Sequence, residues 1–310
     1  MTDPSLHEID RAHVTAVRRA IQRWYSSNAR DLPWRRTSDP YRVLVSEIML
    51  QQTQVDRVAP KYRAFLRRFP TLRSLARARL ADVLRSWSGL GYNARAKRLK
   101  DSAEIIVGKY GSKVPVQAVV LQTLPGVGRY TACAVSSFAF GTREPVVDVN
   151  VRRVLARTLL GEDRANDATA WSLAARILPR RDAAAWTQAL MDLGAGFCRA
   201  TPRCGTCPVR RACTFASNEN EAASHGSPNI ARLVRPRGPR ARFAGSRRFY
   251  RGRIVRALAG APSLSLLALG EQVKDGFATS DLPWLRELLS ELKREGLIAL
   301  DASQSRAALP

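Results

Sequence analysis

The stretch "LPGVGRYTACA", residues 124–134, decides the fold. Gly126 and Gly128 permit positive φ angles and close backbone approach, so they predict a tight turn. A helix is expected to begin near Arg129, where its N–H groups and positive dipole end can take a phosphate oxygen. An ordinary helix–helix connection is the alternative. Together with its flanking helices the turn predicts a helix–hairpin–helix, which grips a DNA backbone without reading bases.

The overall charge also indicates a polyanionic partner. The 310 residues contain 51 Lys and Arg against 26 Asp and Glu, a net charge of +25, and 45% are hydrophobic. Such a balance favours nucleic-acid binding over a surface that is basic only for solubility. No apolar run approaches the roughly 20 residues of a membrane span, and "MTDPSLHEIDRAH" does not resemble a signal peptide. We expect a cytoplasmic, nucleoid-associated monomer with no membrane partner.

Most of the first 215 residues read as helix, so the fold class is all-α. "HEIDRAHVTAVRRAIQRWYSS" places apolar residues at a near-helical period, and Asp39 with Pro40 predicts the start of another helix. "REPVVDV" is the one short β-branched run in this region. We predict domain boundaries at 1–215, a polar and then Arg-rich linker at 216–248, and a small domain at 249–310.

The C-terminal third is basic. Ten arginines and no acid lie between Gly226 and Arg256, which we interpret as a DNA-contacting arm, with a disordered basic tail as the alternative. Beyond it the pattern predicts three helices and a strand, with Leu285, Leu288, Leu289 and Leu292 on one apolar face. This is a candidate for a winged-helix-like unit.

Four cysteines form the clearest metal signal: Cys198, Cys204, Cys207 and Cys213 lie within 16 residues, separated by five, two and five residues. Thiolates are soft ligands suited to zinc or iron–sulfur clusters. Structural zinc usually takes two close pairs set well apart, so a compact run with one C-x-x-C favours a 4Fe–4S cluster over zinc. Cys133 is expected to be a core residue.

Two acids stand in unusual contexts. In "SEIMLQQTQV", residues 46–55, Glu47 lies beside apolar residues and precedes a block of neutral hydrogen-bonding side chains. In "VVDVNVRRVLAR", Asp148 follows two valines and precedes a helix, which by itself predicts only an N-cap.

The order of these elements resembles the helix–hairpin–helix DNA glycosylases of the endonuclease III superfamily, and within it the MutY-type adenine DNA glycosylases. The resemblance covers roughly residues 10–215. The motifs that carry it are "ARDLPWRR", "SEIMLQQTQV", "GLGYNARAKRL", "LPGVGRYTACA", "VVDVNVRRVLAR" and "ALMDLGAGFC".

The resemblance implies removal of adenine mispaired with 8-oxoguanine or guanine from double-stranded DNA. Glycosidic bonds break through an oxocarbenium-like transition state served by two carboxyl groups, one of which is protonated. Apolar surroundings favour a protonated carboxylic acid at neutral pH, so Glu47 suits the acid, and the resemblance implies that it protonates N7 of adenine. Asp148 would stabilise the sugar carbon, with Tyr130 and Asn150 around it.

The remaining site residues also come from the resemblance. Arg30, Arg35 and Asp192 are implied near Glu47 and the flipped base, and Gln51, Gln52 and Thr53 fill the gap left by the extruded adenine. The other implied DNA contacts are Leu90, Tyr92, Gly126, Gly128 and Arg129. Many relatives carry a Nudix-like C-terminal domain with a Phe-Ser-His loop, a tripeptide that does not occur after residue 215.

Three other functions stay open. A G:T or G:U mismatch thymine or uracil glycosylase of the same superfamily would share Tyr130, Asp148 and the cysteines. Endonuclease III is less well supported, because its lyase chemistry needs a Lys nucleophile where this chain has Tyr130. A non-catalytic iron–sulfur DNA-binding protein would not need both Glu47 and Asp148.

Overall fold

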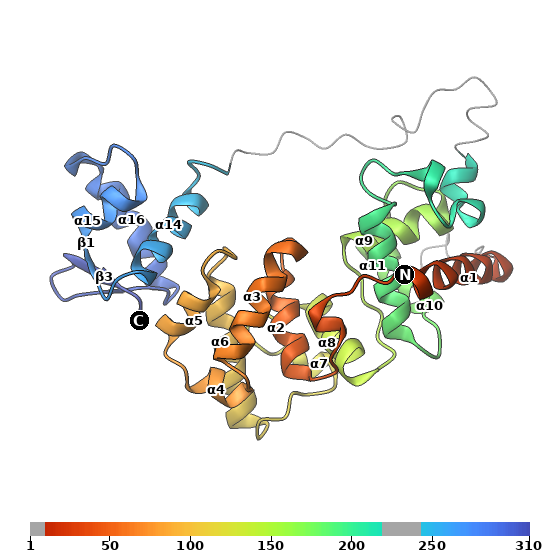
Figure 1. Ribbon diagram of the computed structural model, residues 1–310, viewed down its shortest axis with the longest axis horizontal. Helices are drawn as coiled ribbons and strands as arrows, with labels where there is room; N and C mark the ends of the chain where they lie inside the picture. Colours follow the sequence, from red (N-terminus) through yellow and green to blue (C-terminus); the bar gives the residue numbers. More distant parts are fainter. Residues whose placement is uncertain (1–9, 219–242) are drawn as a thin grey trace. The chain divides into compact units, whose positions relative to one another are not determined.

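The computed structural model describes residues 10–218 and 243–310. Contacts divide the chain into two compact units, Met1–Arg35 with Ala132–Gly238 and Arg36–Thr131 with Pro239–Pro310. Helix α8 (Arg129–Phe140) contains the boundary between Thr131 and Ala132 (Figure 1). Among residues 10–215 the structure has helices and no strand, so the all-α prediction for this region is confirmed. The domain boundaries predicted at residues 215 and 248 stay predictions.

The first unit brings the N-terminal helix together with the helices that follow α8. Asp10 caps α1 through hydrogen bonds from Ala12 N and His13 N, and the predicted apolar stripe buries Val17 and Ile21. The elements of this unit besides α8 are α1 (Arg11–Asn28), η2 (Pro33–Arg35), α9 (Val149–Leu155), η3 (Ala156–Leu160), α10 (Asp167–Ile177), α11 (Ala183–Gly196), η4 (Cys204–Thr206) and η5 (Arg210–Ala212).

The second unit is built around α2 (Pro40–Leu50). Asp39 caps this helix and Pro40 occupies its first turn, as predicted. Eight of its eleven residues are buried, and a helix that is buried on nearly all sides needs apolar residues on nearly all sides. The other helices of residues 36–131 are α3 (Val55–Arg68), α4 (Leu72–Arg77), α5 (Leu80–Trp87), α6 (Ala94–Lys109) and α7 (Ala118–Leu121).

The predicted hairpin joins α7 to α8. Val127 N donates to Leu124 O over 3.1 Å, and Gly126 has a φ of +77°. A Cβ on Gly126 would lie 3.0 Å from Arg98 Cβ on α6. Glycine is therefore required here both by the turn and by the close approach of α6.

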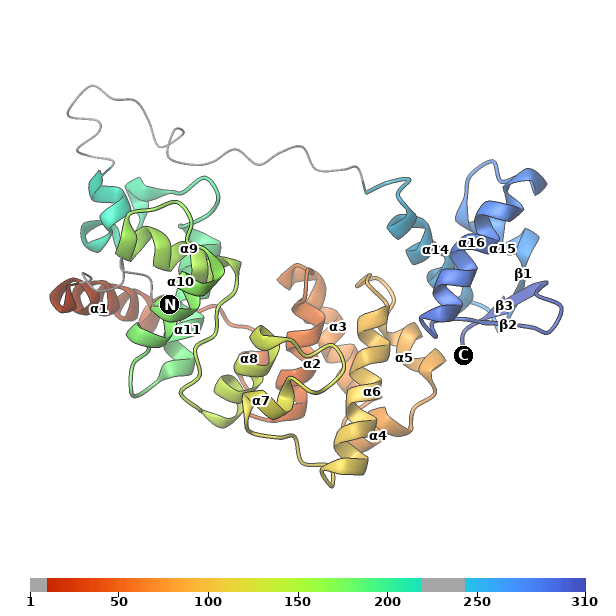
Figure 2. The same cartoon turned by 180° about the vertical axis from the view of Figure 1, so that it is seen from behind.

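The C-terminal part of the second unit has the element order of a winged helix. Helices α14 (Arg247–Ala259), α15 (Leu266–Val273) and α16 (Leu282–Arg294) accompany an antiparallel sheet of order β1–β3–β2, visible in Figure 2. Its strands are β1 (Leu264–Ser265), β2 (Ala299–Leu300) and β3 (Arg306–Ala308), and η6 (Thr279–Asp281) precedes α16.

The prediction of a single strand was wrong, because strands of two or three residues are too short to show an alternating pattern. The predicted apolar face of α16 is confirmed, since Leu285, Leu288, Leu289 and Leu292 are all buried.

Residues 219–242, which make up most of the linker predicted at 216–248 and contain the first five arginines of the arginine-rich stretch, lie outside the described residues. The other five arginines of that stretch belong to α14. Within the described ranges, no helix is both long and apolar enough to cross a membrane.

Candidate active site and cysteine-lined cavity

Asp148 is the N-cap of α9 and is surrounded by donors. One carboxylate oxygen accepts from Asn150 N over 2.8 Å and Val151 N over 2.6 Å, and the other accepts from Asn150 Nδ2 over 2.9 Å. Burial raises the pKa of Asp148, while the hydrogen bonds from Val151 and Asn150 and the charge of Arg153 act in the opposite direction. A partly buried carboxylate is thus held in one orientation by three hydrogen bonds.

Arg153 connects this carboxylate to the next helix and to the cysteine loop. Its Nη2 donates to Asn150 Oδ1 over 2.8 Å and to Gly194 O over 2.9 Å, and its Nε donates to Cys198 O. A Cβ on Gly194 would lie 2.6 Å from Asn150 Cβ. Helices α9 and α11 therefore pack so closely at Asn150 that α11 needs a glycine there.

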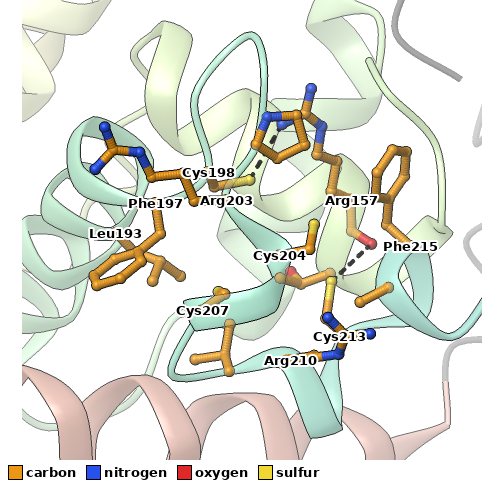
Figure 3. Close-up of a pocket in the computed structure, with 14 residues that line it drawn as sticks. Arg157, Leu193, Phe197, Cys198, Arg203, Cys204, Cys207, Arg210, Cys213 and Phe215 are labelled. Atoms are coloured by element: carbon orange, nitrogen blue, oxygen red, sulfur yellow. Dashed lines mark hydrogen bonds between the residues drawn. The ribbon is translucent and has the colours of Figure 1, made fainter. Parts of the chain in front are cut away.

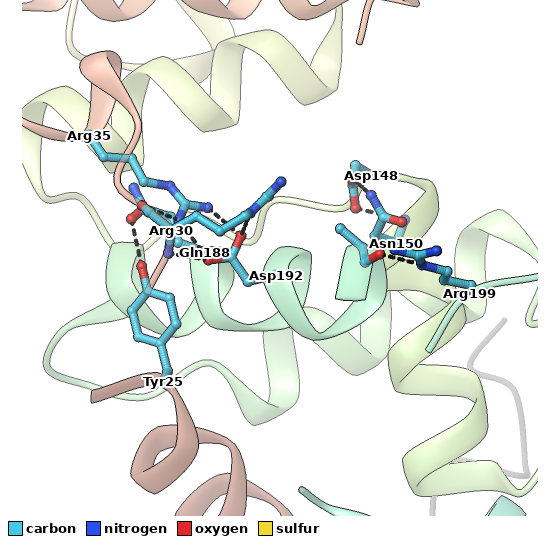
Figure 4. Close-up of polar contacts among 9 residues, drawn as sticks. Tyr25, Arg30, Arg35, Asp148, Asn150, Gln188, Asp192 and Arg199 are labelled. Atoms are coloured by element: carbon cyan, nitrogen blue, oxygen red, sulfur yellow. Dashed lines mark hydrogen bonds and ion pairs between the residues drawn. The ribbon is translucent and has the colours of Figure 1, made fainter. Parts of the chain in front are cut away.

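A second carboxylate, Asp192 of α11, is 3% exposed and receives two arginines (Figure 4). Arg35 donates to both oxygens over 2.7 and 2.9 Å, while Arg30 donates from Nε over 2.5 Å and from its backbone N over 3.1 Å. Burial alone would raise the pKa of Asp192, but the hydrogen bonds and charges of Arg35 and Arg30 outweigh it and lower the pKa. The predicted trio of Arg30, Arg35 and Asp192 is thus brought together as an internal ion cluster.

Glu47 belongs to the second unit, where it lies on α2 and is 4% exposed. Its neighbours Ser46, Ile48 and Met49 are each at most 1% exposed. Glu47 is therefore a buried carboxyl group on a helix that is buried along most of its length.

Arg95 of α6 fixes the two loops that follow α2 and α5. It is 6% exposed and donates from Nη1 to the carbonyls of Ile48, Met49 and Gln51 at the end of α2. Its Nη2 donates to Thr53 Oγ1 over 3.0 Å and to the carbonyls of Leu90 and Gly91. Burial lowers the pKa of Arg95 to about 10, so it stays charged at neutral pH. A helix C-terminus has carbonyls without intrahelical partners, and this buried cation satisfies them.

The neutral side chains that follow α2, Gln51, Gln52 and Thr53, each have a different role. Gln51 Nε2 donates inward to Gly126 O over 3.1 Å and to Thr131 Oγ1 over 3.2 Å, which ties α2 to the hairpin. Thr53 is held by Arg95, whereas Gln52 is exposed with a φ of +54°. Gln52 is the member of the predicted wedge that is available to a partner.

Leu90 and Tyr92, two further predicted DNA contacts, differ in how far their side chains are exposed. Leu90 is 3% exposed and belongs to the core, so a contact between its side chain and DNA stays a prediction. Tyr92 is 37% exposed and has a φ of +47°. Two non-glycine residues in the left-handed region, Gln52 and Tyr92, therefore flank Arg95; such strain persists only where the surroundings enforce it.

The hairpin places its predicted contacts at the start of α8. Gly128 and Arg129 are exposed and Tyr130 is half-buried. A Cβ on Gly128 would meet nothing within 4 Å, so open space surrounds the turn in front of the helix. An exposed helix N-terminus preceded by glycines is suited to a phosphate.

The four predicted cysteines, Cys198, Cys204, Cys207 and Cys213, line one cavity (Figure 3). Phe197, Phe215 and Val209 complete its apolar part. Burial raises the pKa of Cys207 to about 11 and also raises the pKa of Cys213, so both are thiols unless a metal displaces the proton. In the described ranges no three His, Cys, Asp or Glu side chains are grouped as ready-made metal ligands. The donor set, four soft thiols around one cavity, nevertheless fits an iron–sulfur cluster.

Arg157 provides a charged wall to this cavity. It is 1% exposed and lies on η3, a π-helical turn that continues α9. Its Nη1 donates to Cys198 Sγ over 3.6 Å and to Arg199 O over 2.6 Å, and it pairs with Asp163. Single π-helical turns are frequent at functional sites, and this one carries Arg157 toward the cysteines.

Sequence reasoning missed Arg95, Arg153, Arg157 and Gly194. Two of them have a local signal, since Arg153 lies three residues after Asn150 on a helix that begins at Asp148, and Gly194 lies inside a helix, where glycine is unfavourable. The partners of Arg95 and Arg157 are mostly backbone carbonyls distant in sequence, which no local pattern indicates.

Comparisons with known proteins identify the family of this chain. Residues 45–179 match the family described as HhH-GPD superfamily base excision DNA repair protein. The adenine DNA glycosylase of Mycolicibacterium smegmatis is 43% identical over 242 residues, which cover 76% of this chain and 78% of that protein. The adenine DNA glycosylase of Mycobacterium tuberculosis is 48% identical over 195 residues, 60% of this chain and 63% of that protein. The human adenine DNA glycosylase is 43% identical, and the match covers 40% of its length. The matches therefore span less than two thirds of the last two proteins.

Solved structures show the same fold. A thermostable thymine-DNA glycosylase superposes with a TM-score of 0.63 at 29% identity, covering 67% of this chain and 98% of that one. Endonuclease III in a non-covalent DNA complex gives a TM-score of 0.58 at 22% identity, a likeness of fold alone. The fold is that of a helix–hairpin–helix base excision DNA repair protein. Within that class the chain belongs to the adenine DNA glycosylase family.

Proposed function

We propose that this protein hydrolyses the N-glycosidic bond of adenine mispaired with 8-oxoguanine or guanine in double-stranded DNA. Membership of the family makes the chain a DNA N-glycosylase. The observation that carries the proposal is Glu47, a carboxyl group 4% exposed in a helix whose other buried residues are mostly apolar. Such an acid can be protonated at neutral pH and transfer a proton to a leaving base.

Glu47 is proposed to protonate adenine at N7. Protonation makes adenine a better leaving group and builds positive charge on the sugar ring as the bond stretches. Asp148 is proposed to be the carboxylate that stabilises this charge. Its support is the hydrogen-bonding shell of Asn150 and Val151, which fixes the carboxylate before the reaction and so avoids reorganisation during it.

DNA is proposed to bind through its backbone at the hairpin, where Gly128 and Arg129 are exposed. Gln52 and Tyr92 are proposed to occupy the space left when adenine leaves the stack, because both are exposed on loops fixed by Arg95. A neutral amide such as Gln52 can donate to and accept from a base edge.

The cysteine-lined cavity is proposed to hold a 4Fe–4S cluster on Cys198, Cys204, Cys207 and Cys213. When bound, such a cluster would cross-link the loop after α11 and replace the thiol protons. Purified protein should contain about four irons per chain. Cys204→Ser should lower the iron content and the melting temperature, whereas Cys133→Ser should leave the iron content unchanged. One zinc and no iron per chain would contradict the cluster.

The reaction is tested by single-turnover cleavage of an end-labelled duplex containing A:8-oxoguanine. Glu47→Gln keeps the shape of the side chain but has no readily transferable proton, so the rate should fall by about 10²–10⁴-fold with little change in duplex affinity. Asp39→Asn, which alters the exposed cap of the same helix, is the control for folding of α2. Full activity of Glu47→Gln would remove Glu47 from this role.

The competing activities are separated by the same assay. Duplexes with A:8-oxoguanine, A:G, G:T and G:U distinguish an adenine glycosylase from a thymine or uracil glycosylase. The relatives named adenine DNA glycosylase are 36–48% identical and the thymine-DNA glycosylase structure is 29% identical, which supports adenine. Strand cleavage without alkali would indicate lyase chemistry, which Tyr130 does not support because it carries no amine.

A further inference from the structure

A basic groove of about 760 Å³ lies within the second unit, between the C-terminal domain and the loops that Arg95 fixes. Arg248, Arg251, Arg253 and Arg256 of α14 line one side. Arg57, Arg95 and Arg98 line the other side, together with Gln51, Gln52 and Tyr92. Glu295 is the one acid among the lining residues. The groove therefore attracts a polyanion.

Contacts between the two walls are direct. Arg248 donates to Tyr92 Oη, and its guanidinium lies 5.1 Å from the centre of the Tyr92 ring and 4.9 Å from that of Phe243. Arg85 Nε also donates to Ala259 O over 3.3 Å, and Ala81 N donates to Pro310 O over 3.0 Å. Arg248 thus lies between two aromatic rings that are 37% and 53% exposed. Exposed aromatic rings interleaved with arginine are typical of surfaces that bind a nucleic-acid strand.

Five of the seven lining arginines form no ion pair in the described structure, since only Arg251 and Arg253 do. Arg95 is buried and Arg57 donates to Gly89 O, which leaves Arg98, Arg248 and Arg256 exposed with neither an acidic partner nor a bond to a backbone carbonyl there. Arg251, in contrast, pairs with Glu291 over 2.9 Å and with Glu295 over 2.6 Å. The charge available to a ligand is therefore concentrated on these three arginines.

Helix α16, the third helix of the winged-helix order, carries Arg286, Lys293 and Arg294 but lines the groove only through Leu292. In helix-turn-helix proteins the second helix of the motif normally enters the major groove. Here Glu287 and Glu291 of α16 are engaged by Arg247 and Arg251 of α14. The loop between β2 and β3 is folded around Asp301, which accepts from Ser303 and Ser305. The acids of α16 are thus occupied by α14, none of its cations lines the groove, and an acidic loop does not suit phosphates.

We propose that the C-terminal domain binds DNA through α14 rather than α16, and that Arg98, Arg248 and Arg256 hold the phosphate backbone of the strand lying against Gln52 and Tyr92. The inference rests on the proposed function, since it takes DNA as the ligand. The element order of the domain alone would predict DNA binding by α16, whereas the proposal assigns DNA binding to α14.

Gly252 supports the assignment. It lies inside α14 and lines the groove, and a Cβ there would meet nothing within 4 Å. Glycine inside a helix costs about 1 kcal/mol relative to alanine, yet no neighbouring atom requires it here. The open space beside Gly252 belongs to the groove.

The test is the salt dependence of DNA binding by the full chain. The duplex carries 2′-fluoroadenosine opposite 8-oxoguanine, because the fluorine resists formation of the oxocarbenium and prevents turnover. Arg248→Ala/Arg256→Ala is compared with Arg286→Ala/Arg294→Ala, two exposed arginines of α16 without ion pairs in the described structure. Both pairs remove two positive charges.

The α14 pair should lower the slope of log Kd against log salt by about 1.8, or about 0.9 per lost phosphate contact, and weaken binding at least tenfold. The α16 pair should change the affinity less than twofold. Gly252→Glu should weaken binding while Gly252→Ala does not, and Arg248→Lys, which retains the charge, should keep the slope. Equal effects of the two pairs, or an unchanged slope for the α14 pair, would overturn the proposal.

Adenine release from the natural A:8-oxoguanine duplex, measured on the same proteins, separates this inference from the proposed function. Wild type that releases no adenine, together with the expected difference in slopes, would refute the substrate and leave the groove assignment standing. Wild type that releases adenine, together with normal binding by the α14 pair, would refute the groove alone. Thermal melting of each variant identifies any that has failed to fold. If an arginine variant fails to fold, the DNA affinity of Gly252→Glu decides whether the groove binds DNA.

Discussion

Arg153 and Asn150 form a bridge between α9 and the loop after α11: the Nη2 of Arg153 lies 2.8 Å from Asn150 Oδ1, while Asn150 donates to Asp148. The same guanidinium holds the carbonyl of Cys198, the first cysteine of the cavity. The orientation of the carboxylate thus depends on the loop that the cysteines belong to.

Arg153→Ala should lower the rate of base release by about 10–100-fold, because a hydrogen bond to a charged group is worth about 1.5–3 kcal/mol. Arg152→Ala is the matched control, since Arg152 pairs with the exposed Asp167. The measurement is single-turnover cleavage with iron content determined in parallel. Equal rates for the two variants would show that Arg153 does not position Asn150.

Gly194→Ala should destabilise the protein by about 1–3 kcal/mol, the usual cost of overpacking. Its Cβ would lie 2.6 Å from Asn150 Cβ and 3.2 Å from Asn150 Cα. Gly196→Ala, on the same helix with nothing within 4 Å, should be neutral or stabilising. Chemical denaturation of both variants checks the difference, and a Gly194→Ala protein as stable as Gly196→Ala would contradict the close packing.

Asp148→Asn should abolish most activity, by about 10²–10³-fold, and yet raise the stability at neutral pH. Burial raises the pKa of Asp148, so the folded state binds this proton more tightly than the unfolded state. The stabilisation that comes from this tighter proton binding is fully present below 3.8, the ordinary pKa of Asp. It is lost as the pH rises through the raised pKa of the folded state. The asparagine avoids that loss. Melting temperatures measured from pH 7 to pH 4 should therefore converge as the pH falls; a less stable Asp148→Asn at pH 7 would show that the hydrogen bonds outweigh burial.

Arg95→Lys should cost about 3 kcal/mol or more, because several buried carbonyls lose their donor and each costs about 1–3 kcal/mol. Lysine keeps the charge but lacks the planar fork that reaches two loops. Arg98→Lys, on the exposed face of the same helix, should be nearly neutral for stability. Urea unfolding compares the two, and equal losses would mean that charge alone holds the loops.

Local signals explain what the sequence could predict. Asp39, Asp148 and the hairpin glycines act on residues within three or four positions, so capping and turn geometry follow from neighbouring letters. The cysteine spacing likewise falls within 16 residues. These features could be predicted because they depend on interactions between residues that are close in sequence.

The rest depends on contacts between distant segments. Arg95 bonds to carbonyls more than 40 positions away, and a carbonyl is the same at every residue, so nothing in the sequence marks the pair. Leu90 could not be assigned to the core because a leucine in a Gly-rich loop is compatible with either burial or exposure. Glu287 and Glu291 of α16 pair with arginines of α14, which only tertiary structure reveals.

The salt cluster of Arg30, Arg35 and Asp192 has a consequence for the order of synthesis. Residues 10–35 are made before their partners, which include Asp192 and the helix around it, made more than 150 residues later. Residues 36–131, which belong to the other unit, emerge from the ribosome in between. Helix α1, with Val17 and Ile21 on its apolar side, therefore stays without its native packing for most of translation. Helix α1 is thus made long before it can reach its final partners, and this interval is when chaperones have access to it.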